Sequence, residues 1–352
     1  MRRVGRSRTA IGVDVGSRSI KVAQLFISGG KPEIAALSML PRTKVAEQMD
    51  PEDILTMKRV LKRQGFYGNE VVLAAPEGGL FRGVIDVPPQ LSGTPVAQIA
   101  RMELSRIHNV VPDSFEMVCW DPPDPDKSKA TMQAVAIGCP HERANAFIDL
   151  FEDCGFRVSA LDVRIAAAAR ACISLTVPPP ALTAILDIGW ESTKLLFVCG
   201  STVVYERPFR NKCLAKLRAK LSETFGITEE ASDQVISTVG FATDGEAGKL
   251  DQKSVEVVRR MLGKHFDMML EELEGSFDYA NYQHPREGIK RLLLIGGGAN
   301  ISGLSQYLHN TLAVEVRSAA PSDVVENSPR IFTKVGHPAM TVAVGLAMFT
   351  GE

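Results

Sequence analysis

The most constraining feature of this chain is a short glycine-containing stretch, residues 11–21, that recurs at residues 184–194. In each copy an apolar run leads into an aspartate, Asp14 or Asp187, and a glycine follows two positions later. A second apolar run follows each copy, so both stretches predict β-hairpins whose tight turns leave backbone N–H groups free. A repeat on this scale indicates a duplicated domain.

The first copy carries the groups that a phosphate chain requires. Gly16 allows the tight turn, free backbone N–H groups and the Lys21 ammonium suit negative charge, and Asp14 suits a hydrated Mg²⁺. Such a run also describes ordinary hairpins, and it is the second copy that favours a ligand site. Two facing hairpins can hold one nucleotide between two lobes. The turn itself consists of Ser17, Arg18 and Ser19.

A third glycine-rich element ends a predicted buried strand in the last quarter of the chain. Three consecutive glycines, Gly296, Gly297 and Gly298, are followed by Asn300 and then by a predicted helix. Glycines at such a position let the backbone approach a flat ligand such as adenosine. A plain strand-to-helix turn is the alternative interpretation.

Together these elements resemble the actin/Hsp70/hexokinase ATPase fold over almost the whole chain. Residues 14–21 resemble its first phosphate loop, residues 187–193 its second and residues 296–298 its adenosine loop. The resemblance implies an α/β fold of two duplicated lobes that bind ATP and Mg²⁺, the ion being held through water by Asp14 and Asp187. The nucleotide contacts that it implies are Asp14, Gly16, Ser17, Arg18, Ser19, Lys21, Asp187, Gly189, Thr193, Glu230, Gly296, Gly297, Gly298 and Asn300.

An insert interrupts the first lobe. The order strand-helix-strand-strand-helix-strand over residues 83–162 predicts a self-contained small α+β (SHS2-like) subdomain. A small lobe at this place occurs in FtsA, the cell-division ATPase, and in PilM, the type IV pilus assembly protein. The predicted domains are 10–82 with 163–180 (subdomain 1A), 83–162 (1C), 181–210 with 286–352 (2A) and the helical 211–285 (2B).

Local sequence favours the PilM family over FtsA. Residues 81–88, 101–103 and 155–163 resemble PilM segments that lead into, cross and leave the insert. FtsA normally ends in a membrane-binding amphipathic helix, whereas this chain ends at Glu352, just after a predicted core helix. The PilM resemblance implies a partner, the short cytoplasmic N-terminal peptide of a PilN-like bitopic inner-membrane protein, bound near the insert.

Two departures from the family pattern bear on chemistry. Similar proteins usually carry Glu-Pro after the strand that ends near Val163, where this chain has Arg164-Ile165. A cation can pair with a phosphate but cannot orient a water as a base, so ATP hydrolysis is expected to be weak or absent. The helix after Thr228 usually carries a lysine toward adenosine, where this chain has Val235, so Glu230 and Gln234 are expected to reach the ribose or base instead. For both departures, sequence drift with nucleotide still bound is the alternative interpretation.

Composition narrows the function classes. The 352-residue chain has a formal net charge of −1, which argues against a nucleic-acid partner. Its apolar runs are short, which argues against direct membrane insertion, and its six cysteines form no C-x-x-C pair, which suits reduced thiols in the cytoplasm.

Two classes of function remain open at this stage. One is a nucleotide-loaded cytoplasmic scaffold, placed at the inner membrane through partners and able to self-associate. The other is an enzyme, a small-molecule kinase or phosphatase of the same fold. No third aspartate is evident as a catalytic base, so no catalytic residue is assigned and a scaffold is favoured.

Overall fold

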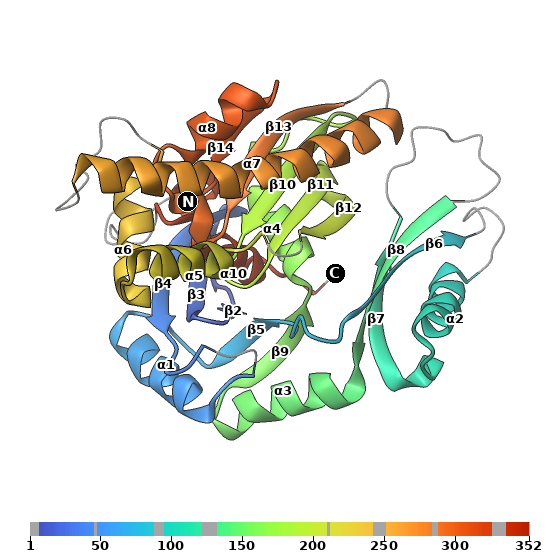
Figure 1. The fold of residues 1–352 in the computed structure, drawn as a ribbon. Helices are drawn as coiled ribbons and strands as arrows, with labels where there is room; N and C mark the ends of the chain where they lie inside the picture. The colour runs from blue at the N-terminus through green and yellow to red at the C-terminus, as the bar shows by residue number, and fades with distance from the viewer. Residues whose placement is uncertain are drawn as a thin grey trace.

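The computed structural model describes residues 7–45, 48–87, 95–121, 132–209, 212–241, 251–283, 288–325 and 336–351. The chain forms two lobes, each built on a mixed sheet with the same strand pattern, and a smaller third sheet at one side (Figure 1).

The first sheet is a hairpin meander extended by parallel strands. Its order is β4-β3-β2-β5-β9, with the short β1 also on β3. The first three strands pair antiparallel and the last two pair parallel. The strands are β1 (Ser7–Arg8), β2 (Ile11–Val15), β3 (Ser19–Ser28), β4 (Lys31–Pro41), β5 (Glu70–Ala74) and β9 (Arg157–Asp162).

The second sheet repeats this plan. Its order is β12-β11-β10-β13-β14, again with three antiparallel strands followed by two parallel ones. The predicted duplication is therefore present strand for strand. The strands are β10 (Leu182–Ile188), β11 (Thr193–Cys199), β12 (Thr202–Phe209), β13 (Ile289–Ile295) and β14 (Glu315–Ser318).

Two helices rich in small residues pack together between the sheets, α4 (Arg164–Cys172) and α10 (Thr341–Ala347). Their backbones approach so closely that a Cβ on Gly345 would overlap the backbone of Ala167. Small side chains are required there because two helices can approach this closely only without bulky groups.

Most of the other helices cover the outer faces of the two lobes (Figure 1). In the second lobe the long α7 runs across the sheet (Figure 1), and its Phe266, Met269 and Phe277 side chains pack in the core. The helices are α1 (Pro51–Arg63), α2 (Val96–His108), α3 (His141–Asp153), α5 (Leu214–Phe225), α6 (Glu229–Val239), α7 (Gln252–Gln283), α8 (Leu304–Thr311) and α9 (Pro321–Val324).

The insert differs from its prediction in extent. Its sheet, in the order β6-β8-β7, consists of β6 (Phe81–Val87), β8 (Met132–Pro140) and β7 (Phe115–Trp120), and α2 packs on it. However, β9 pairs with β5 of the first sheet, and α3 lies with α1 in the first lobe (Figure 1). Buried apolar side chains that follow the insert, such as Phe151, join this lobe's core. We therefore propose the insert as residues 81–140 rather than 83–162.

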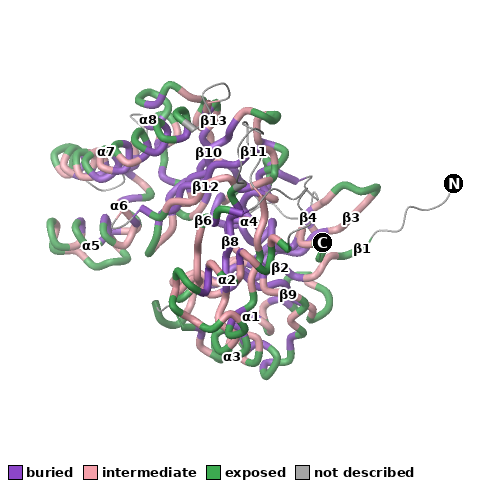
Figure 2. The backbone as a smooth tube through the Cα atoms, turned by 90° about the vertical axis from the view of Figure 1, so that its right-hand side faces the viewer, coloured by how far each residue is buried: buried purple, intermediate pink, exposed green. Residues whose placement is uncertain are grey.

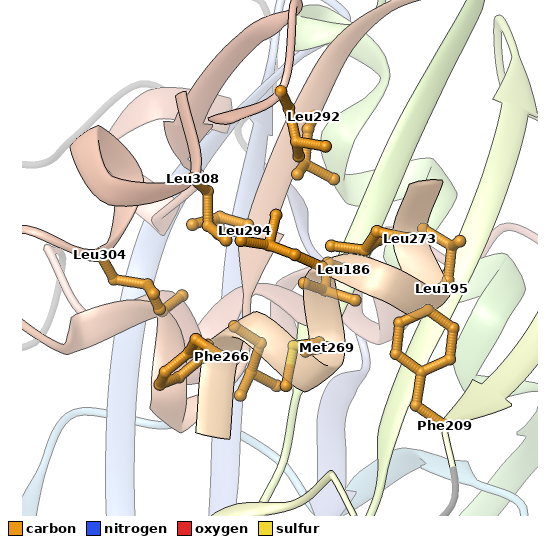
Figure 3. Close-up of a cluster of buried hydrophobic side chains, with 14 of the residues drawn as sticks. Leu186, Leu195, Phe209, Phe266, Met269, Leu273, Leu292, Leu294, Leu304 and Leu308 are labelled. Carbon is orange, nitrogen blue, oxygen red and sulfur yellow. The ribbon is translucent and has the colours of Figure 1, made fainter. Parts of the chain in front are cut away.

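Burial follows this plan of lobes. Figure 2 shows buried backbone concentrated along the two large sheets, with exposed segments on the outer helices. The second-lobe core (Figure 3) places Leu186 and Leu294 of the sheet against α7 and α8. Among the described residues, no helix is both long and apolar enough to cross a membrane.

Candidate functional site

The two repeated hairpins, β2–β3 and β10–β11, line one cavity between the lobes, with a volume of about 830 Å³. Their registers match, because Asp14 lies opposite Lys21 and Asp187 lies opposite Lys194. The turns close with matching backbone bonds, Gly16 N–H to Ser19 O at 3.0 Å in the first and Gly189 N–H to the corresponding carbonyl at 2.9 Å in the second.

Most residues that the sequence predicts for a nucleotide site lie around this cavity. The glycine-rich segment also lines this cavity through Gly296 and Gly297. Gly296 adopts a φ of 82°, and a Cβ at this position would overlap the Asp187 carboxylate, so only glycine fits there. Contact with a nucleotide itself stays a prediction. The predicted residues that line the cavity are Asp14, Gly16, Ser17, Arg18, Ser19, Lys21, Asp187, Gly189, Gly296, Gly297 and Asn300.

Three predicted residues do not line the cavity. Thr193 is buried and donates its hydroxyl hydrogen to the Lys212 carbonyl at 2.7 Å. Gly298 is buried where a Cβ would overlap the Ile188 side chain, so packing explains its identity. Glu230 is exposed in the first turn of α6, whereas Gln234, one turn on, lines the cavity.

The first hairpin holds a buried ion cluster. Asp14 is 1% exposed, and its carboxylate lies 2.6 Å from an Arg164 nitrogen and 3.5 Å from the Lys21 ammonium. Arg164 also donates to the Val15 carbonyl at 3.1 Å, which fixes the guanidinium under the turn. Burial opposes the charge of Arg164, but Asp14 and then Glu77 raise its pKa, so it remains a cation.

The second hairpin is arranged differently. The Lys194 ammonium lies 2.5 Å from a Glu77 carboxylate oxygen of the first lobe. Burial raises the pKa of the Asp187 carboxyl, although the Arg164 guanidinium acts in the opposite direction. This hairpin therefore contributes an interlobe ion pair and an aspartate that is harder to ionise.

Glu77 is a site residue that the sequence analysis missed. Burial alone would raise its pKa, but Lys194, Arg164 and Arg82 outweigh burial and lower the pKa to about 2. Arg82 lies 2.5 Å from Glu77 and 3.3 Å from Glu206 of β12, so the cluster joins the insert to both lobes. The position of Glu77 just beyond β5 is a signal that could have identified this residue, because parallel strands bring their carboxyl ends to one edge of the sheet, where ligands bind.

Trp190 in the second turn is another missed residue. The guanidinium groups of Arg18 and Arg218 each lie 4.1 Å from its ring centre. Arg18 crosses from the first lobe to pair with Asp233 of α6 at 2.7 Å. Stacked cations over an indole stabilise such a contact, so the cavity is bridged on this side too.

The carboxylates fit the implied Mg²⁺ poorly. Both oxygens of Asp14 face cations of the chain, and burial keeps Asp187 closer to its neutral form, whereas magnesium needs ionised or polar oxygen ligands. Within the described ranges, no group of three or more His, Cys, Asp or Glu side chains could hold a metal ion. The role of Asp14 and Asp187 in holding the ion through water stays a prediction that these contacts do not favour.

Comparison with known families distinguishes the PilM family from an FtsA-like protein. The family model described as type IV pilus assembly protein PilM matches residues 12–350. The chain belongs to the PilM family. This membership favours the pilus alternative over the FtsA-like one. Among curated protein sequences, none matches this chain.

Solved structures agree on the fold. A chain of the PilM-PilN type IV pilus biogenesis complex superposes with a TM-score of 0.76 at 19% identity, covering 97% of this chain and 98% of that chain. The ethanolamine utilization protein EutJ from Carboxydothermus hydrogenoformans has a TM-score of 0.54 at 14% identity, covering 99% and 92%. The structure of MreB5 of Spiroplasma citri bound to ADP has a TM-score of 0.52 at 14% sequence identity, covering 96% of this chain and 94% of that chain. The predicted actin-like ATPase fold with duplicated lobes is confirmed.

Proposed function

We propose that this PilM-family protein is an ATP-binding scaffold of a type IV pilus or related secretion platform at the inner membrane. The observation that carries the proposal is the cavity of about 830 Å³ between two hairpins of matching register. The Lys21 ammonium suits phosphates, and the glycines at 296 and 297 suit adenosine. The similar MreB5 structure is described as bound to ADP, which supports a nucleotide here.

Calorimetry tests ATP binding. Asp14→Ala combined with Lys21→Ala is expected to abolish binding, because it removes the anchor of the Arg164 cluster and a phosphate-binding cation. Asp149→Ala combined with Lys62→Ala is the matched control, since it removes the same two residue types at exposed positions outside the cavity. Unchanged affinity in the first pair would refute this site.

Slow or absent hydrolysis is the second part of the proposal. The charged group nearest to Asp14 is a guanidinium, which cannot accept a proton from water. The cavity-lining carboxylate of Glu77 is engaged by Lys194 and Arg82. A turnover of several per second on pure protein, typical of enzymes, would contradict this part.

The third part is a PilN-like partner peptide bound at the insert. Strand β6 is an edge of its sheet, which can accept an extended peptide as an added strand. The insert exposes several large apolar side chains, as expected for a surface that a partner covers. These are Val84, Met102, Ile107, Val111 and Val118. The neighbouring structure named as a PilM-PilN complex supports a partner of this kind, which would also place the protein at the membrane.

Peptide capture is best tested by a point variant on β6. Deleting residues 83–162 would remove β9 from the first sheet and confuse folding with binding. Val84→Lys, at a position 60% exposed, is expected to weaken binding of the PilN-like peptide in fluorescence anisotropy. Val45→Lys, at a 54% exposed position in the first lobe, is the matched control. Equal affinities for both variants would place the peptide elsewhere.

A further inference from the structure

Arg164 is the charged group nearest to the buried Asp14. One guanidinium nitrogen lies 2.6 Å from Asp14 Oδ1, and the Lys21 ammonium lies 3.5 Å from Oδ2. Each carboxylate oxygen therefore faces a positive charge that belongs to the chain. A hydrated divalent ion would have to displace one of these cations or share its partner.

The position of Arg164 is supported from several sides. It is the first residue of α4, it donates to the Val15 carbonyl at 3.1 Å, and its Nε lies 3.6 Å from Glu77. Its side chain is only 17% exposed yet lines the cavity between the hairpins. Moving it away would leave a buried charge without its partners, which is costly.

A guanidinium in this position can bind phosphate directly. Its terminal nitrogens contact Asp14 and the Val15 carbonyl, and each carries a second N–H that can donate to a phosphate oxygen. The group keeps its charge at all relevant pH values. Lys21 lines the same cavity, so two fixed cations of the chain are available for one polyphosphate. These are the charges that Mg²⁺ otherwise supplies to ATP.

We infer that Arg164, with Lys21, takes the charge role of the divalent cation, so that this chain binds ATP without requiring Mg²⁺. The inference rests on the proposed ATP site. It concerns only which cation accompanies the phosphates in the cavity. It also explains why the carboxylates fit a magnesium ion poorly.

The first test uses the wild-type protein and no variant. ATP is titrated calorimetrically in excess MgCl₂ and again in excess EDTA, and the two dissociation constants are expected to agree within about threefold, because the charge-assisted donors are already in place. Binding in MgCl₂ with none in EDTA would overturn the inference and leave the ATP site intact. No binding in either buffer would refute the proposed function itself.

A charge reversal sharpens the test. Arg164→Glu removes the cation and adds an oxygen ligand, so ATP binding should weaken in EDTA by at least about tenfold relative to MgCl₂, and Mn²⁺ with ATP should give a bound signal in electron paramagnetic resonance. Arg164→Met removes only the charge and serves if the first variant does not fold. Arg106→Glu, on the exposed face of α2, is the control. A bound Mn²⁺ signal in wild type equal to that of Arg164→Glu would contradict the inference.

Discussion

The two hairpins share a backbone and differ in their charges. In both, an aspartate lies opposite a lysine across the strands, and the turn closes through the same backbone bond. In the first, the Asp14 carboxylate stays beside Lys21 and gains Arg164. In the second, the Lys194 ammonium pairs with Glu77 of the other lobe.

The difference shows that a duplicated scaffold can keep one geometry and divide two tasks. The first hairpin gathers cations around the cavity, which suits an anionic ligand. The second hairpin uses its lysine to connect the lobes. Substitutions in the first are therefore expected to affect ligand binding most, and substitutions around the second to affect stability most.

The largest stability effect is expected at Glu77, which holds the second lysine. Glu77→Gln leaves Lys194 and Arg164 without a shared carboxylate and should lower the free energy of unfolding at neutral pH by about 2 to 3 kcal/mol, because the Glu77 side chain is 30% exposed and its partners are more deeply buried. Glu191→Gln, in the exposed second turn, should cost under about 0.5 kcal/mol. Chemical denaturation measures both.

The ion pair between Glu77 and Lys194 also predicts how the free energy of unfolding changes with pH. The folded-state pKa of Glu77 is lowered from 4.5 to about 2, so its contribution is complete above pH 4.5 and is lost as the pH falls toward 2. The difference in unfolding free energy between wild type and Glu77→Gln should shrink over that interval. A constant difference would show that the charge of Glu77 does not stabilise the lobes.

The next largest loss of stability is expected at Gly189 of the second turn, compared with Gly16 of the first turn. A Cβ on Gly189 would lie 2.5 Å from the Ser192 backbone carbonyl, whereas on Gly16 the nearest atom is the Lys21 ammonium, which can move. Gly189→Ala should therefore cost about 2 kcal/mol and Gly16→Ala under about 1 kcal/mol in thermal unfolding. Equal costs would break the argument that the second turn is the tighter one.

Much of this architecture follows from sequence periodicity. The hairpins, their pairing and the glycine segment were predictable because alternating apolar strands and turn glycines are local signals. The insert bounds that we propose could not be predicted in this way, because β9 pairs with β5 only through contacts distant in the chain.

The ion pairs around the cavity could not be predicted from the sequence either. In the sequence, Arg164 is visible only as a departure from the family pattern. Glu77 meets Lys194 across the lobes, and no local spacing encodes that contact. Trp190 likewise reads as an ordinary turn residue until Arg18 and Arg218 lie over it.

A smaller loss of stability is expected where Arg18 of the first turn contacts Trp190 of the second turn. Arg18→Gln removes the pair with Asp233 and the cation over Trp190, but its side chain is 37% exposed, so the cost should be about 1 kcal/mol or less. Arg106→Gln, in an exposed pair within α2, should cost still less. Urea denaturation at low and high salt distinguishes them, since salt screens exposed pairs most.

We propose that both hairpins hold one nucleotide, and the fluorescence of Trp190 measures this directly. The chain has two tryptophans, so Trp120→Phe leaves Trp190 of the second turn as the reporter. Titrating ATP should give a saturable change in its fluorescence with one site per chain, and Asp14→Ala with Lys21→Ala in the first hairpin should abolish that change. ATP binding seen by calorimetry without any response of Trp190, or a response that survives the double substitution, would contradict the account.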